Sequence, residues 1–244
     1  MSATIALLPS PPTAHPRSIL MFLRQLPSME RAGDDALLAL AERIELRRVE
    51  RGASLWSAGD PASEVIWVRS GVIWLRQGRS QGREVSIGYH GRGALLGMHP
   101  GGASAERADD AEVHEDGALL VIRRPAFDAW LAAWPSAVPG VVQSLSELNA
   151  RMQGRLALIG LHGARARLAG LLLELSRSFG VRDSSGVIID LRLTHRELAA
   201  LIGATRETVS VAIVEIRNAG LVRTEQRRVV ITDLDGLIAM AEAG

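Results

Sequence analysis

The chain has 244 residues, of which 47% are hydrophobic and 23% are charged, and its formal net charge is +1. This length and composition predict a folded protein of one or two domains and exclude a disordered chain. Cysteine is absent, which excludes disulfides, thiolate zinc sites, cysteine-ligated iron–sulfur clusters and thiol nucleophiles. Because the sequence contains neither a secretion signal nor ~18 consecutive apolar residues, we expect a cytoplasmic protein without a membrane partner.

The N-terminal half begins with a proline-rich segment. Residues 1–18 contain Pro9, Pro11, Pro12 and Pro16 without any periodic pattern, which predicts a flexible tail. From Asp34 to Ile44, apolar residues recur at helical spacing and predict a short amphipathic helix.

A region rich in β-branched residues follows, from Leu46 to Ile122. Short β-rich runs alternate there with glycine-containing turns, a pattern typical of a compact antiparallel barrel or sandwich. The predicted strands are Val65 to Val68, Val72 to Leu75, Val85 to Tyr89 and Ala118 to Ile122, and the predicted turns contain Gly52, Gly59, Gly71, Gly82, Gly91 and Gly93.

A long helix is predicted after Pro139-Gly140 and extends to about Ile159. Its apolar residues form one narrow stripe with spacings of four, three and four, followed by a one-residue shift, as in the seam of a coiled coil. The predicted seam consists of Val141, Leu145, Leu148, Met152, Leu156 and Ile159. Such a stripe can pair with a second copy of the chain or pack on the chain's own β domain. We expect the first, a symmetric homodimer.

The segment from Thr194 to Gly220 is the most informative. Thr194 and Glu197 have the spacing of a capping box, which starts a helix. Gly203 supplies a tight turn, and Thr205 caps a second helix. Two helices joined by a short glycine turn are typical of a DNA-reading helix-turn-helix, whereas a plain helical hairpin is the structural alternative.

The second of these helices is expected to read base edges in the major groove with its N-terminal residues, Arg206 and Glu207. Arginine suits the O6 and N7 atoms of guanine, and glutamate accepts from the N4 amine of cytosine. Leu221 to Arg223 and Arg228 to Thr232 are predicted to form a two-stranded wing. Seven arginines against four glutamates between Arg192 and Arg228 favour phosphate contacts. The candidate DNA-binding residues are Thr194, His195, Thr205, Arg206, Glu207, Ser210, Arg217, Arg227 and Arg228.

On these residues, the segment from Thr194 to Gly220 resembles the helix-turn-helix of the Crp/Fnr family, and the run from Arg165 to Leu175 extends the likeness upstream. The resemblance covers about 220 residues and implies an α+β protein: a jelly-roll-like β-roll sensor domain, a long dimerisation helix and a C-terminal winged helix-turn-helix. It also implies double-stranded DNA and RNA polymerase as partners. Val211 departs from the family pattern, because many relatives carry a further arginine there. The expected domains are a tail (1–18), the sensor (19–136), the dimerisation helix (137–162) and the DNA-binding domain (163–244).

The resemblance also suggests where an effector would bind. Relatives that bind a cyclic nucleotide hold its ribose with the glutamate of a Gly-Glu-Leu turn and its phosphate with an Arg-Ser or Arg-Thr pair. The corresponding stretches here are Gly93-Ala94-Leu95 and Glu106-Arg107-Ala108, and the hydroxyl pair that contacts the base falls on Met152-Gln153. Only the arginine is kept, which disfavours a conventional cyclic AMP site. The candidate effector-binding residues are Arg107, Ala108, Leu95, Met152 and Gln153.

Three other interpretations of the sensor stay open at this point. Arg107 could hold a different small anion, His90, His99 and His114 could ligate haem or a metal, and the regulator could work without an effector. An enzyme is disfavoured, because the sequence lacks paired carboxylates at catalytic spacing, a GxSxG motif, a Walker loop and an HExxH motif. A pure effector-binding module would lack the DNA-reading helix, so the sequence favours a DNA-binding regulator.

Overall fold

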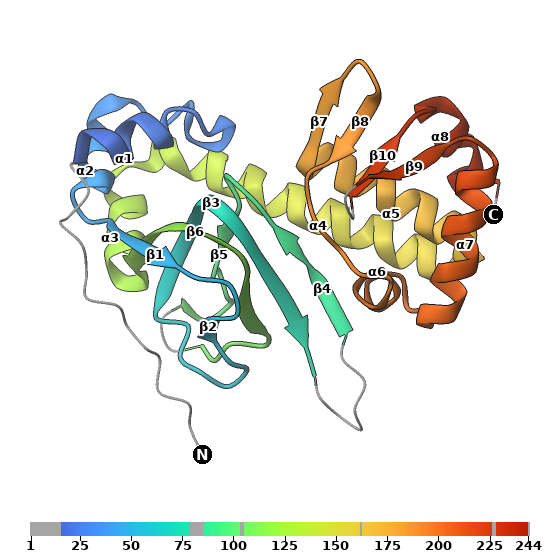
Figure 1. The fold of residues 1–244 in the computed structure, drawn as a ribbon. Coiled ribbons are helices and arrows are strands. Elements are labelled where there is room, and N and C mark those ends of the chain that lie inside the picture. Colours follow the sequence, from blue (N-terminus) through green and yellow to red (C-terminus); the bar gives the residue numbers. More distant parts are fainter. Residues whose placement is uncertain (1–15, 79–84, 103–104, 162, 226–227, 244) are drawn as a thin grey trace. The chain divides into compact units, whose positions relative to one another are not determined.

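Figure 1 shows the fold in a computed structural model, which describes residues 16–78, 85–102, 105–161, 163–225 and 228–243. The described chain divides into two units. The first holds the residues up to Gly78 and from Ile87 to Leu148, and the second holds Val85, Ser86 and those from Asn149 onward. No helix in the described ranges is long and apolar enough to cross a membrane.

The first unit is built on a six-stranded sheet. Strands β1, β2 and β3 all pair antiparallel with β6, and β5 pairs antiparallel with β3. The sheet order is β1-β6-β3-β4. The strands are β1 (Glu45–Val49), β2 (Ser54–Trp56), β3 (Glu64–Gln77), β4 (Val85–His90), β5 (Leu95–Leu96) and β6 (Asp110–Arg123).

Alternate residues of the two longest strands face opposite sides, because side chains alternate along a strand. In β3, Trp67 packs in a cluster shared with the helices, whereas its neighbours Ile66 and Val68 pack in a second cluster with Trp56. Both sides of the sheet are therefore buried. This explains why β3 and β6 contain runs of consecutive apolar residues.

The structure corrects one predicted turn. Val65 to Val68 and Val72 to Leu75 are not separate strands but parts of β3, which continues through Gly71 with shifts in its register against β6. Gly71 has φ +82°, and a Cβ there would lie 2.7 Å from the carbonyl oxygens of Glu115 and Asp116. Glycine at this position thus permits a close approach within a bulged strand. Gly82 lies outside the described residues.

Helices cover the Trp67 side of the sheet. The expected helix at Asp34 is confirmed, and a further helix begins at Pro16, within the segment predicted as a tail. The helical elements of this unit are α1 (Pro16–Leu23), η1 (Pro27–Met29), α2 (Asp34–Ala41), α3 (Arg124–Ala133) and η4 (Pro135–Ala137). The predicted long helix is α4 (Val138–Leu161), which starts in the first unit and ends in the second.

The second unit contains the winged helix-turn-helix. Helix α5 packs against α6, α7 and α8, and the four strands form a sheet with the order β7-β8-β10-β9. The predicted α+β class is confirmed. The elements are α5 (Ala164–Phe179), β7 (Gly180–Asp183), β8 (Gly186–Ile189), α6 (His195–Ile202), α7 (Arg206–Asn218), β9 (Val222–Glu225), β10 (Arg228–Ile231) and α8 (Leu234–Glu242).

Candidate nucleic-acid interface and sensor site

The helix-turn-helix has the caps that its sequence predicts. The Thr194 hydroxyl accepts from the backbone N–H of Glu197 at 3.2 Å, and the Glu197 carboxylate accepts from the backbone N–H of Thr194 at 2.6 Å. Gly203 ends α6 with φ +62° in the left-handed region. Thr205 caps α7 by accepting from the N–H of Thr208 at 3.2 Å. Both threonine hydroxyls thus accept hydrogen bonds from backbone N–H groups in the first turn of a helix, so Thr194 and Thr205 position the two helices.

Helix α7 has a buried face and an exposed face, as its spacing predicts. Its buried residues are Val209, Ala212, Ile213 and Ile216. Arg206 and Glu207 form the exposed first turn, and Arg217 is exposed in the last turn. No acidic partner is recorded for Arg206 or Arg217 in the described part of the chain. Two unpaired guanidinium groups therefore lie on the exposed side of this helix.

Ser210 joins the two helices rather than projecting a free hydroxyl. Its Oγ donates to the carbonyl oxygen of Arg206 at 2.9 Å and lies 2.8 Å from Nδ1 of His195. The single hydroxyl proton of Ser210 is therefore used within these two contacts. Ser210 thereby fixes His195, the first residue of α6, against α7.

The predicted wing is formed by β9 and β10, which pair antiparallel. Arg228 donates to Asp190 at 2.8 Å, and Arg223 pairs with Glu225 at 2.9 Å. The two described wing arginines, Arg223 and Arg228, thus have carboxylate partners, so their charge is partly offset before any phosphate approaches. Arg227 lies outside the described residues.

The sensor site centres on Arg107, whose side chain is buried with 4% of its surface exposed. One of its terminal nitrogens, Nη2, donates to the carbonyl oxygen of Glu64 at 2.8 Å, and its guanidinium carbon lies 4.2 Å from the centre of the Trp56 ring. The Nε and Nη1 groups have no partner in the described structure. Burial lowers the pKa of Arg107. A buried cation with unused N–H groups is suited to an oxyanion.

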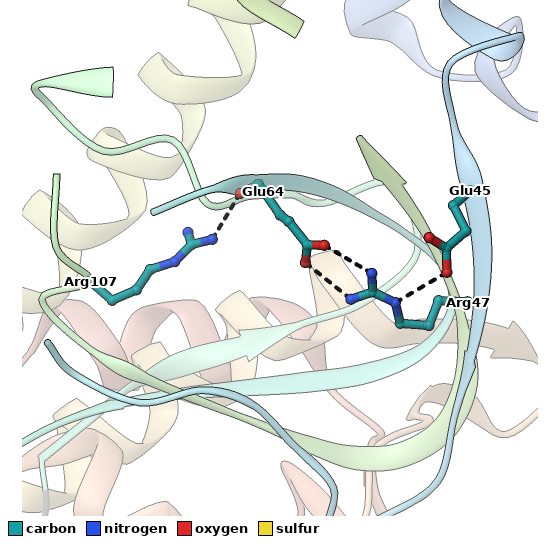
Figure 2. A network of polar contacts seen from close by, with 4 residues as sticks. All are labelled: Glu45, Arg47, Glu64 and Arg107. Atoms are coloured by element: carbon teal, nitrogen blue, oxygen red, sulfur yellow. Dashed lines mark hydrogen bonds and ion pairs between the residues drawn. The ribbon is translucent and has the colours of Figure 1, made fainter. Parts of the chain in front are cut away.

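The Glu64 carboxylate does not bind the Arg107 guanidinium, as Figure 2 shows. The Glu64 carboxylate instead binds Arg47 through two hydrogen bonds of 2.9 and 3.0 Å, and Glu45 adds a 3.6 Å ion pair to the same guanidinium. The hydrogen bond to Glu64 raises the pKa of Arg47. The side chain of Glu64 thus accepts hydrogen bonds from Arg47, whereas its backbone carbonyl oxygen accepts the one from Arg107.

The other predicted effector residues are placed differently. Leu95 packs in the cluster with Trp67 and the helices, whereas Trp56, the ring beneath Arg107, belongs to the cluster on the other side of the sheet. Ala108 is exposed beside Arg107. Met152 and Gln153 are exposed on α4 in the second unit. Among the three candidates of the first unit, Arg107 and Ala108 are therefore neighbours, and Leu95 packs on the other side of the sheet.

Sequence reasoning missed Gly97. It follows β5 with φ +87°, and a Cβ there would lie 2.5 Å from the carbonyl oxygen of Glu64 and 2.8 Å from Nη1 of Arg107. Gly97 therefore lies beside Arg107, whereas Gly93 of the predicted Gly93-Ala94-Leu95 stretch lies against Leu26. The only signal in the sequence was a glycine placed directly after two apolar residues.

The three sensor histidines do not form a cluster. His90 and His114 are buried, and His114 meets the Tyr89 ring edge-on with centroids 4.7 Å apart. Burial lowers the pKa of His99, and Arg107 and Arg124 act in the same direction. Within the described ranges, no three histidine or carboxylate side chains gather closely enough to hold a metal ion.

The predicted dimer seam divides into two parts. Val141 is buried to 4% exposure in the core of the first unit, and Leu145 packs against the same core. Leu148 is half-buried, whereas Met152 and Leu156 are exposed to 36% and 70%. The side chain of Ile159 lies outside the description, although its backbone belongs to α4. Val141 is thus covered by its own domain and is unavailable to a second chain.

A β-sheet unit, a long helix and a winged helix-turn-helix, joined in one chain, define a class of transcription regulator. Residues 46–133 match the cyclic nucleotide-binding domain family, and residues 166–240 match the Crp-like helix-turn-helix domain family. The transcriptional regulatory protein btr of Bordetella pertussis is 32% identical over 190 residues, which cover 78% of each chain. The chain belongs to the Crp/Fnr family of transcription regulators, as the sequence motifs indicate.

Two further relatives agree with this assignment. The CRP-like cAMP-activated global transcriptional regulator of Mycobacterium tuberculosis is 26% identical over 210 residues, which cover 84% of this chain and 92% of that protein. A transcriptional regulator of the CRP/FNR family from Thermus thermophilus has a similar structure, with a TM-score of 0.65, 27% identity and coverage of 81% of this chain and 98% of that chain. These relatives are regulators rather than enzymes, so the expectation of a non-enzymatic protein is confirmed.

Proposed function

We propose that this protein binds palindromic duplex DNA as a homodimer, reads bases with Arg206 and Glu207, and is controlled by a ligand at Arg107. The observation that supports DNA reading most directly is the tip of α7, where both side chains are exposed while Val209 and Ile213 anchor the helix in its core. Such a helix fits the major groove. The protein would act where the DNA is, in the predicted cytoplasm, with RNA polymerase as a further partner.

Selection from random duplexes tests this function. A symmetric dimer with two recognition helices requires an inverted repeat whose half-sites lie about 10 to 11 base pairs apart from centre to centre. We expect the full-length protein to enrich such a palindrome. Enrichment of a single unpaired half-site, or of no sequence at all, would count against the proposed function.

For the dimer, we propose a seam rotated by one residue from the one that the sequence alone suggested. Exposed apolar side chains on α4 include Val138, Val142, Met152 and Leu156. Together with Leu145, Asn149 and Ile159 they follow alternating spacings of four and three residues, the pattern of a two-stranded coiled coil. Val142 and Asn149 thus replace Val141 and Leu148. A single asparagine among apolar seam residues fixes the register of two parallel helices.

For the sensor, we propose a ligand that presents an oxyanion to Nε and Nη1 of Arg107. The two N–H groups are buried without partners, and an unmet buried donor costs ~1 to 3 kcal/mol. A cyclic nucleotide fits this site only through its phosphate, because Ala108 has no hydroxyl and Gly97-Met98-His99 offers no carboxylate for a ribose. A small anionic metabolite therefore fits the site better than cyclic AMP.

Replacing Arg107 with lysine should weaken ligand binding about ten- to a hundredfold, because lysine keeps the charge but loses the planar fork of donors. A thermal-shift screen with inorganic phosphate, cyclic AMP and small carboxylates would identify the ligand class, and tryptophan fluorescence would report it, since Trp56 lies under the guanidinium. Arg124→Lys is the matched control, because this second buried arginine already binds Asp128 at 2.7 Å. Equal effects of both variants on the ligand-induced shift would contradict a role specific to Arg107.

Phosphate contacts should come more from Arg217 than from Arg228. Arg217 has no carboxylate partner among the described residues, whereas Arg228 is paired with Asp190 at 2.8 Å. Each lost phosphate contact lowers the slope of log K against log salt by about 0.9, or about 1.8 for a dimer. We expect Arg217→Ala to approach this change and Arg228→Ala to fall well below it. The affinity of each variant for the palindrome would be measured from about 50 to about 300 mM salt. A larger change of slope for Arg228→Ala than for Arg217→Ala would mean that the wing arginine is the main phosphate ligand.

A further inference from the structure

Helix α7 exposes an apolar side chain on the side opposite its buried face. Val211 is 60% exposed and Val214 is 40% exposed. Val211 lies one helical turn after Glu207 on the face opposite Val209 and Ile213, which are buried. One exposed valine on a protein surface is ordinary. This one lies between exposed arginines at both ends of the helix that is proposed to enter the groove.

We infer that Val211 contacts the C5-methyl group of a thymine in each half-site. This role rests on the proposed DNA binding. It adds a thymine to the bases that Arg206 and Glu207 are proposed to read at the start of α7. The thymine methyl is the one large apolar group in the major groove, and apolar side chains recognise thymine through it. From Glu207 to Val211 the helix rises about 6 Å, close to two base-pair steps of about 3.4 Å, so the thymine lies one or two base pairs from the one that Glu207 reads.

The neighbouring polar group does not compete for this base. Ser210, the residue before Val211, donates its hydroxyl proton to the Arg206 carbonyl oxygen, and its Oγ lies 2.8 Å from Nδ1 of His195. The middle of the exposed face is therefore left with valine methyl groups and no free hydroxyl. A position read by these groups is recognised through apolar contact and not through hydrogen bonds.

The place of Val211 on the helix favours DNA as its partner. Val211 lies one turn after Glu207, on the exposed side of the helix that is proposed to enter the groove, and Glu215, one turn further on, pairs with Arg165 at 3.8 Å. Arg206 and Arg217 are exposed at the two ends of the same helix, more than 100° around its axis from Val211, where they can contact phosphates beside the groove.

Uracil substitution tests the contact directly, because deoxyuridine lacks only the methyl group of thymidine. In the selected palindrome, each thymine of one half-site would be replaced in turn, and the affinity of the full-length protein would be measured. We expect one position at which uracil weakens binding about fourfold per half-site, and about fifteenfold when both half-sites are changed, from the loss of one buried methyl contact.

Val211→Ala should remove this sensitivity, so that the variant binds thymine- and uracil-containing sites equally. Val214→Ala is the matched control, since it shortens a second exposed valine of the same helix and should keep the sensitivity. Unchanged melting temperatures would show that both variants are folded. A palindrome without thymine near the Glu207 position, or uracil effects that are the same in wild type and Val211→Ala, would overturn the inference and leave this face to a protein partner. Failure to select any palindrome would instead refute the proposed function.

Discussion

Replacing Leu156 with glutamate is expected to convert the homodimer into monomers and to weaken binding to the palindrome by at least about a thousandfold. Leu156 is 70% exposed on α4 and lies at the centre of the last apolar part of the proposed seam. Two facing carboxylates there would remove apolar burial and repel each other. A monomer holds only one half-site, so it keeps about half of the binding free energy of a complex whose Kd is typically about 10⁻⁸ to 10⁻¹¹ M.

Sedimentation velocity and titration of the selected duplex would measure the two effects of Leu156→Glu separately. Ala150→Glu is the matched control, because it adds the same charge to an exposed position of α4 that lies off the seam. We expect this control to stay dimeric and to bind normally. A Leu156→Glu protein that sediments as a dimer would place the seam elsewhere, and a monomer with wild-type affinity would break the link between dimerisation and DNA binding.

The helix-turn-helix could be predicted from sequence because its signals are local. The Thr194–Glu197 capping box, the turn at Gly203 and the cap at Thr205 each act within a few residues, and all three appear in the structure. The pairing of Arg228 with Asp190 was not predictable in the same way. Those two residues are far apart in the sequence and meet only because β10 pairs with β8. Local sequence signals therefore predicted the helix that reads DNA but not the ion pair in the wing.

The sensor depends on contacts between distant segments, which the sequence pattern does not record. Gly71 was predicted as a turn because strand-like runs flank it, but its close approach to Glu115 and Asp116 in β6 makes it part of one bulged strand. Arg107 is buried because Trp56 and the carbonyl oxygen of Glu64 meet its guanidinium from other strands. The family resemblance predicted that an arginine lies at this site. It did not predict that the Nε and Nη1 groups of this arginine are buried without hydrogen-bond partners in the described structure.

The stripe on α4 illustrates a similar limit. Helical spacing alone places Val141 and Val142 only about 100° apart, so either can begin an apolar seam. The core of the first unit decides between them, because it buries Val141 and leaves Val142 53% exposed. The same rotation moves Asn149 into the proposed seam in place of Leu148. A polar residue at this position is a poor match to a purely apolar pattern and was therefore overlooked.

Replacing Glu207 with alanine should change which sequence the protein selects more than how tightly it binds DNA in general. Its carboxylate is exposed on the first turn of α7, where it can accept from the N4 amine of a cytosine. Losing that contact should reduce discrimination at one base pair of each half-site by ~1 to 3 kcal/mol, a factor of about five to 150.

Selection from random duplexes by wild type, Glu207→Ala and Glu215→Ala would measure this change at every position of the site. Glu215→Ala is the control, because it removes the same charge from the same helix, and its carboxylate pairs with Arg165 at 3.8 Å rather than projecting from the tip. We expect relaxed preference at a single base pair per half-site for Glu207→Ala alone. A Glu207→Ala protein with the wild-type preference at every position would mean that α7 does not read bases with its first turn.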